Sequence, residues 1–426
     1  MSVVFNYLYI RQEDYSEHTF FKEIKSFLPS TYCVIQTKNN NLKFRQHFYY
    51  SLEKNISSLK KTSDESFIET FKDSIKIRLR SDVSNGLLLS GGIDSSSIAA
   101  EVSNLINNKK DITFFHARSF ENENDESSKA GFIANQLGND LITLTPDKDV
   151  LINEISKVTY TQDQPFGGPS ILMGYNIFRK IHESPQKVIL GGQGADEILL
   201  GYERYLSAFI KPFNIFELNN FRKFSNQTSI SYSDLLKYYF YFRSLSIRKF
   251  ILNKTRCIKR DFIKMQDTSI IESTVKSFNN PIKLQLSEIK SNQLPHLLRY
   301  EDRNSMAHSV ESRLPFLDHR LVEKALTLDL DSKISNGWTK LILRKYLDDM
   351  NLQKIAWQKK KFGFEAPLNF WFNNNKVNFL DIIQQSEIIK EICIFDEIVK
   401  LAKQKDINKL WPYISLSVWE SQFKVT

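Results

Sequence analysis

Short apolar runs alternate with stretches of helical periodicity in the first half of the chain. The runs that predict buried strands lie at 87–89, 112–117, 140–144 and 187–190. The stretches that predict helices lie at 67–77, 94–102, 126–137, 150–158 and 171–181. Strands and helices that alternate at this spacing are typical of parallel βαβ units with helices on both faces of the sheet. We therefore expect an α/β fold whose functional site lies at the carboxyl ends of the strands.

The two ends of the chain carry different patterns. The N-terminal region is predicted to contain strands at 3–10, 32–37 and 42–48 and a helix at 20–27. The polar stretch 53–65 is interpreted as a linker. From 205 to 426 the pattern becomes mainly helical, which predicts a helical subdomain packed over the site; the clearest examples are 235–242 and 321–328.

The first predicted strand of the sheet is joined to a helix through Ser90, Gly91 and Gly92. Two glycines allow a tight turn that brings backbone N–H groups close to a ligand, and the helix that follows adds its own N–H groups. Its first turn carries Asp94, whose carboxylate suits Mg²⁺. The set predicts a pyrophosphate-binding loop. A turn whose glycines only permit close packing is the alternative, and a Walker loop is excluded because no Gly-Lys-Ser/Thr follows.

A second glycine-rich loop follows the last of these strands. It contains Gly191, Gly192 and Gln193, and it leads to the carboxylate of Asp196. Because the carboxyl ends of parallel strands meet at one edge of a sheet, Asp196 and Asp94 are expected to hold one Mg²⁺ ion from two sides. The alternative is a solvent-exposed turn with acidic residues at a helix start, which the helix dipole favours in any case.

Composition restricts the class of ligand and the compartment. The chain of 426 residues has 58 Lys and Arg against 49 Asp and Glu, a net charge of +9. This charge suits an anionic ligand, but the basic residues are spread along the chain, which argues against a nucleic-acid partner. No apolar run approaches the length of a membrane span, and residues 1–6 lack the features of a signal peptide. The three widely spaced cysteines predict reduced thiols and a cytoplasmic protein.

Six motifs occur in order along the chain. They are Ser90-Gly-Gly-Ile-Asp-Ser-Ser, Asp163-Gln-Pro-Phe-Gly-Gly-Pro-Ser, Gly192-Gln-Gly-Ala-Asp-Glu, Arg303-Asn-Ser-Met-Ala-His-Ser-Val-Glu-Ser-Arg-Leu-Pro-Phe-Leu-Asp318, Lys340-Leu-Ile-Leu-Arg344 and Lys361-Phe-Gly-Phe-Glu-Ala-Pro367. Together they resemble the synthetase domain of the asparagine synthetase family over residues 60–426. The resemblance implies a parallel-sheet ATP-pyrophosphatase core of HUP or Rossmann-like type with a mainly helical part at 205–426. It also implies that residues 1–52 are a small, β-rich, degenerate remnant of a glutaminase-like domain.

The family implies roles for the residues that match its motifs. The residues that would bind ATP are Leu89, Ser90, Gly91, Gly92, Asp94, Ser95, Ala117, Gly191 and Gly192, with Mg²⁺ on Asp94 and Asp196. Lys361 would stabilise the negative charge of the transition states, and the alternative is that it is one of three solvated lysines at 359–361. Asp302, Arg303 and Glu311 would form the acceptor side of the cleft, and a buried ion-pair network between helices is the alternative for them.

Two features depart from the usual family pattern. Gln193 stands where the family usually carries an acid; its amide can hydrogen-bond but cannot act as a base, so amine deprotonation would fall to another residue, to solvent or to the substrate. Ser2 follows Met1, whereas the family's glutaminase nucleophile is an N-terminal cysteine. We therefore expect no glutamine hydrolysis by this chain. Ammonia, a separate glutaminase subunit or a substrate amine would supply the nitrogen.

The expected function is that of an ATP-dependent amide-forming ligase. Aspartate with ammonia is the default substrate pair. A small-molecule or peptide carboxylate of a natural-product, modified-peptide or polysaccharide pathway is the close alternative, because the domain also resembles β-lactam synthetases and lasso-peptide cyclases. The retention of Asp94, Asp196 and Lys361 argues against a non-catalytic nucleotide-binding subunit, and the lack of a catalytic cysteine pair argues against a sulfur-transferring ATP pyrophosphatase. The sheet edge of a reduced N-terminal remnant would suit a partner protein or a second copy of the chain.

Overall fold

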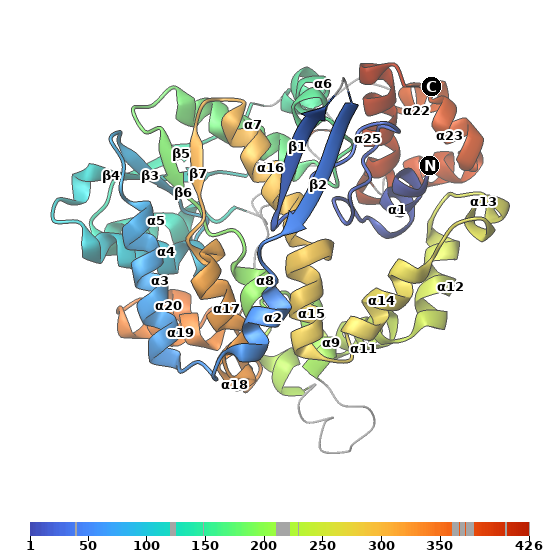
Figure 1. The fold of residues 1–426 in the computed structure, drawn as a ribbon. Coiled ribbons are helices and arrows are strands. Elements are labelled where there is room, and N and C mark those ends of the chain that lie inside the picture. Colours follow the sequence, from blue (N-terminus) through green and yellow to red (C-terminus); the bar gives the residue numbers. More distant parts are fainter. Residues whose placement is uncertain are drawn as a thin grey trace.

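The computed structural model describes residues 1–425 except 39–40, 120–124, 148, 210–221, 229, 360–365, 367–370, 372–378 and 405–406. The protein contains a sheet of five parallel strands, which lies on the left-hand side of Figure 1. In spatial order they are β5 (Leu141–Leu144), β4 (Ile112–Ala117), β3 (Asn85–Leu88), β6 (Val188–Leu190) and β7 (Glu311–Arg313). The order of the strands reverses between β3 and β6, and in α/β sheets such a switch point is where ligands bind. The predicted Rossmann-like α/β class is confirmed.

Helices cover both faces of this sheet because its strands are apolar on both sides. Phe114 of β4 packs in the core that contains α3 (Asp64–Arg78), α4 (Ile93–Leu105), α5 (Ser127–Leu137), α17 (His319–Thr327) and α19 (Leu341–Asp349). Its neighbour Phe115 points to the opposite face and packs against Ile177 and Phe178 of α7 (Ser170–His182). This alternation is the period of two that a strand imposes.

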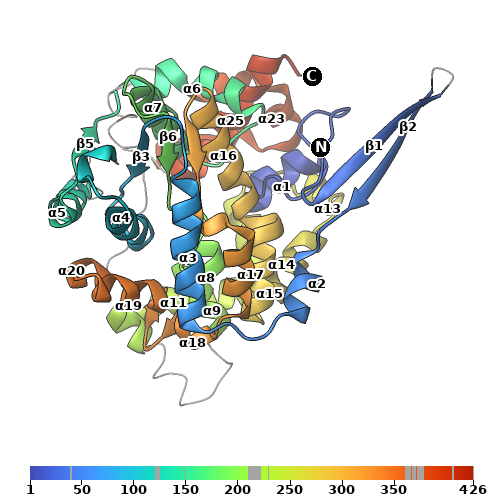
Figure 2. The ribbon, with the colours of Figure 1, turned by 60° about the vertical axis from the view of Figure 1, so that its left-hand side comes forward.

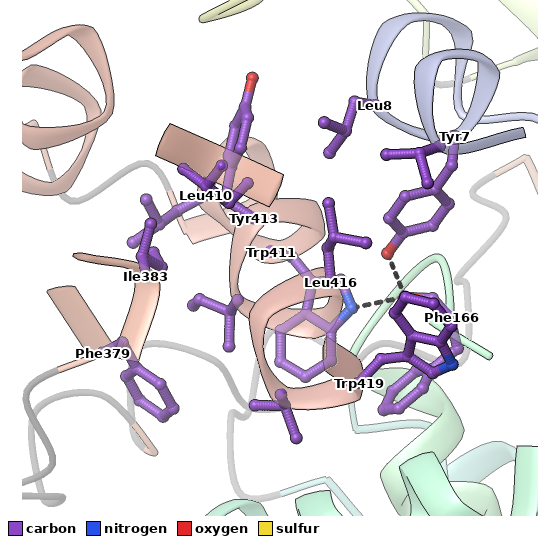
Figure 3. Packing of buried hydrophobic residues seen from close by; sticks show 14 of the residues in the cluster. Tyr7, Leu8, Phe166, Phe379, Ile383, Leu410, Trp411, Tyr413, Leu416 and Trp419 are labelled. Carbon is purple, nitrogen blue, oxygen red and sulfur yellow. Dashed lines mark hydrogen bonds between the residues drawn. The ribbon is translucent and has the colours of Figure 1, made fainter. Parts of the chain in front are cut away.

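A second, helical core lies beyond α7. Its helices are α1 (Ser2–Ile10), α6 (Val150–Gln162), α12 (Leu245–Thr255), α22 (Phe379–Gln385), α23 (Glu387–Ile392), α24 (Phe395–Lys403) and α25 (Ile407–Phe423). Figure 3 shows how α1 and α25 converge on one carbonyl: the Phe166 oxygen accepts hydrogen bonds from the Tyr7 hydroxyl at 2.9 Å and from Trp411 Nε1 at 2.8 Å. The loop at 163–168 is thereby fixed from two sides.

A third group of helices surrounds a smaller core below the sheet. The members are α9 (Leu206–Phe209), α11 (Tyr232–Arg243), α14 (Ser269–Ser277), α15 (Pro281–Ser287) and α18 (Leu330–Lys333). The short helix α8 (Ala195–Leu199) instead packs in the core that contains Phe114. The remaining elements are α2 (Leu52–Ser58), α13 (Arg260–Lys264), α16 (Leu294–Met306), α20 (Gln353–Ala356), the hairpin β1 (Thr31–Lys38) and β2 (Asn41–Phe48), and the short pair β8 (Ile334–Ser335) and β9 (Trp338–Thr339). In the part of the chain that the structure describes, no helix has the length and apolar character needed to cross a bilayer.

The N-terminal predictions are correct for the hairpin and wrong for its surroundings. The predicted strand at 3–10 is the helix α1, whose residues 3–9 are all buried. A short, continuously apolar run has no alternation that would separate a strand from a buried helix. The predicted helix at 20–27 is a set of turns, because the Thr19 hydroxyl donates to the carbonyls of Phe21 and Ile24 and competes with helical hydrogen bonding. The origin of residues 1–52 as a domain remnant stays a prediction.

Two further elements differ from expectation. The stretch 53–65, interpreted as a linker, contains most of α2, and the Ser51 hydroxyl caps that helix by accepting the N–H of Lys54. The strand β7 was not predicted, since its residues are polar and lie in the mainly helical half. It nevertheless extends the central sheet by pairing with β6.

Candidate active site

A cavity of about 510 Å³ lies at the carboxyl ends of β3 and β6, at the switch point of the sheet. Most of the sequence-predicted site residues line it: Leu89, Ser90, Gly92, Asp94, Ser95, Ala117, Gly191, Gly192, Gln193 and Asp196. The fold thus brings together two loops that are almost a hundred residues apart along the chain.

The first loop is held in shape by its own hydroxyl groups. The Ser95 Oγ accepts the N–H of Ser90 at 3.1 Å, and the two hydroxyls lie 3.0 Å apart. The Ser90 Oγ accepts the N–H of Gly92 at 3.2 Å, and Gly92 is the N-cap residue of α4. Gly91 faces α5 and does not line the cavity: a Cβ atom added to Gly91 would lie 3.0 Å from the Cβ of Lys129 on that helix. The N-terminus of α4 therefore opens directly into the cavity.

The second loop touches the first at Gly192. A Cβ atom on Gly192 would lie 3.1 Å from the backbone nitrogen of Ser95 and 3.2 Å from the Cβ of Asp94. Only glycine allows this close approach without moving the first loop. As a result, the two loops form one continuous wall around the start of α4.

Asp94 and Asp196 share one cation, the ammonium group of Lys340. Its Nζ lies 2.6 Å from Asp94 Oδ2 and 2.7 Å from Asp196 Oδ1. Burial alone would lower the pKa of Lys340, but the carboxylates of Asp196 and Asp94 outweigh this effect and raise it. A Cβ on Gly201 would overlap Lys340 Cε and Asp196 Oδ1, so glycine is required beside the pair. Lys340 begins the motif Lys340-Leu-Ile-Leu-Arg344, but no role for this residue was predicted from the sequence.

The two carboxylates suit a magnesium ion that is also bound by phosphate. They come from separate loops and already converge on a single positive charge at hydrogen-bond distance, so the donor set is one that a cation can satisfy. Among the described residues no group of three or more His, Cys, Asp or Glu side chains is arranged to hold a metal. Mg²⁺ commonly binds through one or two carboxylates and takes its other ligands from substrate phosphates and water. Asp94 and Asp196 fit that pattern.

One face of α16 forms a further wall of the cavity, beside Gly191 of the second loop. Leu297, Tyr300, Glu301 and Asn304 line the cavity, and their spacing of three and four residues places them on one side of the helix. Glu301 Oε1 accepts a hydrogen bond from the Ser312 hydroxyl at 2.8 Å. Burial raises the pKa of Glu301. The helix therefore brings a carboxyl group with an increased affinity for protons to the cavity.

The residues predicted for the acceptor side lie outside this wall. Asp302 faces a separate cavity, and the half-exposed Arg303 pairs with Asp163 at 2.6 Å. Glu311 begins β7, at the amino end of the strand and away from the carboxyl edge, where it pairs with Arg313 at 2.8 Å. Lys361, the predicted charge-stabilising residue, lies outside the described residues.

His116 is a buried side chain that the sequence analysis did not single out. It lies at the end of β4, is 3% exposed and lines the cavity. Its Nδ1 lies 2.8 Å from the carbonyl oxygen of Leu89. Burial lowers the pKa of His116, so the ring is neutral and Nδ1 carries the proton that Leu89 accepts. The ring thus fixes the strand end from which the first loop departs.

The fold and the site together define a Rossmann-like α/β protein with two glycine-rich loops at the switch point of its sheet. The chain belongs to the asparagine synthase family, whose family model matches residues 66–421. It is 26% identical over 376 residues to asparagine synthetase [glutamine-hydrolyzing] 1 of Bacillus subtilis. The matched region covers 82% of this chain and 58% of the Bacillus protein. It is also similar to two fungal amidases. Chry2 of Gibberella zeae is 25% identical over 411 residues, and chyE of Penicillium rubens is 26% identical over 406 residues.

The chain spans about three fifths of the length of these relatives. Each fungal match covers 83% of this chain and 60% of the fungal protein. Among solved structures, a U34-tRNA thiolase of Methanococcus maripaludis matches 51% of this chain and 78% of its own, with 15% identity and a TM-score of 0.25. A similarity of that size bears on neither fold nor function.

Proposed function

We propose that this protein is an ATP-dependent amide-forming ligase that activates a carboxylate as an acyl-adenylate. The observation that carries the proposal is the convergence of Asp94 and Asp196 beside the N-terminus of α4, in one cavity at the switch point of the sheet. Unpaired N–H groups at a helix start bind anions, and two carboxylates suit the cation that accompanies a triphosphate. Membership of the asparagine synthase family supports the same reaction class.

In the first step a carboxylate oxygen of the substrate attacks the α-phosphorus of ATP. The bond from that phosphorus to the bridging oxygen breaks, and pyrophosphate leaves. The N–H groups of the first loop and of α4 stabilise the charge on the leaving group, and Ser90 and Ser95 maintain the shape of that loop. Mg²⁺ held by Asp94 and Asp196 would supply positive charge against the phosphates. Lys361 of the Lys-Phe-Gly-Phe motif is proposed to add a further positive charge.

In the second step an amine attacks the acyl carbonyl and AMP leaves. The attacking nitrogen must lose a proton, and the amide of Gln193 cannot accept it. Glu301 is proposed as the base, because it lines the cavity and burial raises its pKa. Gln193, on the second loop, is proposed to orient the reacting groups through hydrogen bonds.

The proposed substrates are a carboxylate, with aspartate as the default, and ammonia or another amine. Ammonia is proposed to come from solution or from a glutaminase. The similarity to proteins named amidases in two fungi supports a specialised carboxylate as the second candidate.

The test is magnesium-dependent release of pyrophosphate from ATP, with ammonium and a panel that contains aspartate and larger carboxylates. A burst of pyrophosphate that depends on one carboxylate supports the proposal. A protein that binds ATP but releases no pyrophosphate with any member of the panel contradicts it and favours a nucleotide-binding subunit. The matched pair Asp196→Asn and Asp302→Asn separates the site from its surroundings, because only Asp196 lines the cavity.

A further inference from the structure

The hairpin of β1 and β2 extends away from the body of the protein as an isolated two-stranded ribbon (Figure 2). Every residue of β2 is exposed. Such a ribbon is at best marginally stable in water unless another surface packs against it. Four of its large apolar side chains are nevertheless more than half exposed: Ile35 at 58%, Leu42 at 58%, Phe44 at 65% and Phe48 at 71%.

These four side chains lie on one face of the ribbon. Residues that pair directly across an antiparallel ladder share a face, and the side chains alternate along each strand. Ile35 pairs with Phe44, and two residues away on either side lie the pairs Thr37 with Leu42 and Cys33 with Gln46. The pair Thr31 with Phe48 completes this face, which contains no charged residue. We call it the apolar face.

The opposite face of the ribbon carries its positive charge. It includes the pairs Val34 with Arg45 and Gln36 with Lys43. Tyr32 and His47 also pair here, and their rings stack at 5.1 Å. A sheet that is apolar on one side and charged on the other is the pattern of a sheet with one covered face.

We propose that the apolar face of the β1–β2 ribbon is the contact surface for a second copy of this chain, packed face to face about a two-fold axis. Residues 35, 42, 44 and 48 of each copy would form its centre. The contact leaves Arg45 and Lys43 of both copies in water, so no charge is buried when it forms. A two-fold contact of one patch with itself is the commonest arrangement in protein oligomers.

The exposed area is of the size that such a contact needs. At roughly 200 Å² for a large side chain, the four residues expose on the order of 500 Å² in each copy. Two copies would bury about 1,000 Å², close to the lower limit for a specific interface. A patch of about 500 Å² is also near the largest that monomeric proteins usually expose.

A bilayer is a poorer occupant of the same face. Both edges of a two-stranded ribbon carry backbone N–H and C=O groups without partners in the ribbon, and hydrocarbon cannot satisfy them. In a face-to-face protein contact these edges stay in water. A second copy of the chain is therefore the better occupant of the apolar face.

The experiment is sedimentation velocity of the full chain at micromolar concentrations, without ATP. The wild type is expected to sediment as a dimer of 49.8 kDa chains, and Phe44→Asp as a monomer. Val34→Asp is the matched control: it adds the same charge to the same ribbon, but on the opposite face, and is expected to remain a dimer. Circular dichroism confirms that each variant is folded, which is expected because neither residue belongs to a core cluster.

A wild type that stays monomeric over the whole concentration range overturns the proposal. If that monomer floats with vesicles of anionic lipid, the apolar face binds membranes instead. If the monomer does not float, the apolar face is the contact surface for a different protein. A dimer that Phe44→Asp leaves intact also overturns it, because the contact then lies elsewhere. The test needs no substrate, so it is independent of the proposed function.

Discussion

Replacing Lys340 by methionine removes the positive charge between Asp94 and Asp196 while keeping most of the side-chain volume. The Lys340 side chain is 4% exposed, and those of Asp94 and Asp196 are 20% and 15% exposed. Removal of one partner from a buried ion pair leaves uncompensated charge and typically costs about 3–5 kcal/mol. Because the two carboxylates retain some contact with water, we expect a loss near the lower end, about 3 kcal/mol of the free energy of unfolding.

Urea unfolding without divalent ions measures this loss, and the matched control is Lys345→Met on α19, the helix that Lys340 immediately precedes. Lys345 is 57% exposed and lies 3.8 Å from Asp64, so its replacement should cost less than about 1 kcal/mol. Added Mg²⁺ should stabilise Lys340→Met more than the wild type, because the ammonium group of Lys340 no longer supplies positive charge between the two carboxylates. The reasoning is refuted if Lys340→Met is as stable as the control, or if Mg²⁺ stabilises it no more than the wild type.

Three further predictions concern two residues of the site, Gly201 and Glu301, and the buried Lys333. Gly201→Ala should weaken ATP binding about tenfold or more in calorimetry, since a methyl group would overlap Lys340 and Asp196, whereas Gly131→Ala, with open space around its Cβ position, should bind ATP normally. Glu301→Gln should lower the rate of amide formation about a hundredfold or more while exchange between pyrophosphate and ATP continues, because only the second step needs the base; unchanged amide formation would exclude Glu301. Burial lowers the pKa of Lys333 to about 7 from 10.5, so above pH 7 the unfolded chain binds a proton that the folded chain does not. The stability of the wild type relative to Lys333→Met should therefore rise by roughly 2 kcal/mol between about pH 7 and pH 9 in urea titrations, and a flat difference would contradict the shift.

The central sheet and its loops were predictable because they depend on local patterns. The strand predicted at 112–117 is β4 with the same bounds, and α5 begins one residue later than predicted and ends at the same residue. Both glycine loops follow apolar strands, and parallel topology then brings their carboxylates to one edge. No long-range information is needed for that inference.

The cavity wall on α16 was not predicted. On this helix the resemblance to the family implied roles for Asp302 and Arg303, which lie off the side that carries Leu297 and Tyr300. The helical spacing of the buried Leu294, of Leu297 and of Glu301 places these three residues on one side, and this signal was present in the sequence. A role for Asp302 and Arg303 on the acceptor side stays a prediction.

Lys340 and β7 could not be located from local pattern, for a different reason. The position of Lys340 between two carboxylates depends on how α19 packs against α4, far away in the sequence. The polar strand β7 forms because its backbone pairs with β6, not because its side chains favour a strand. Both are decided by tertiary contacts, which composition and periodicity do not encode.

The most direct test of the account follows heavy oxygen from a labelled carboxylate substrate into the products. Attack of the carboxylate on the α-phosphorus predicts that AMP carries one labelled oxygen per turnover and that pyrophosphate carries none. Formation of ADP together with labelled phosphate would instead mean activation as an acyl phosphate. That result would contradict the assignment of Asp94, Asp196 and the start of α4 as a site that releases pyrophosphate.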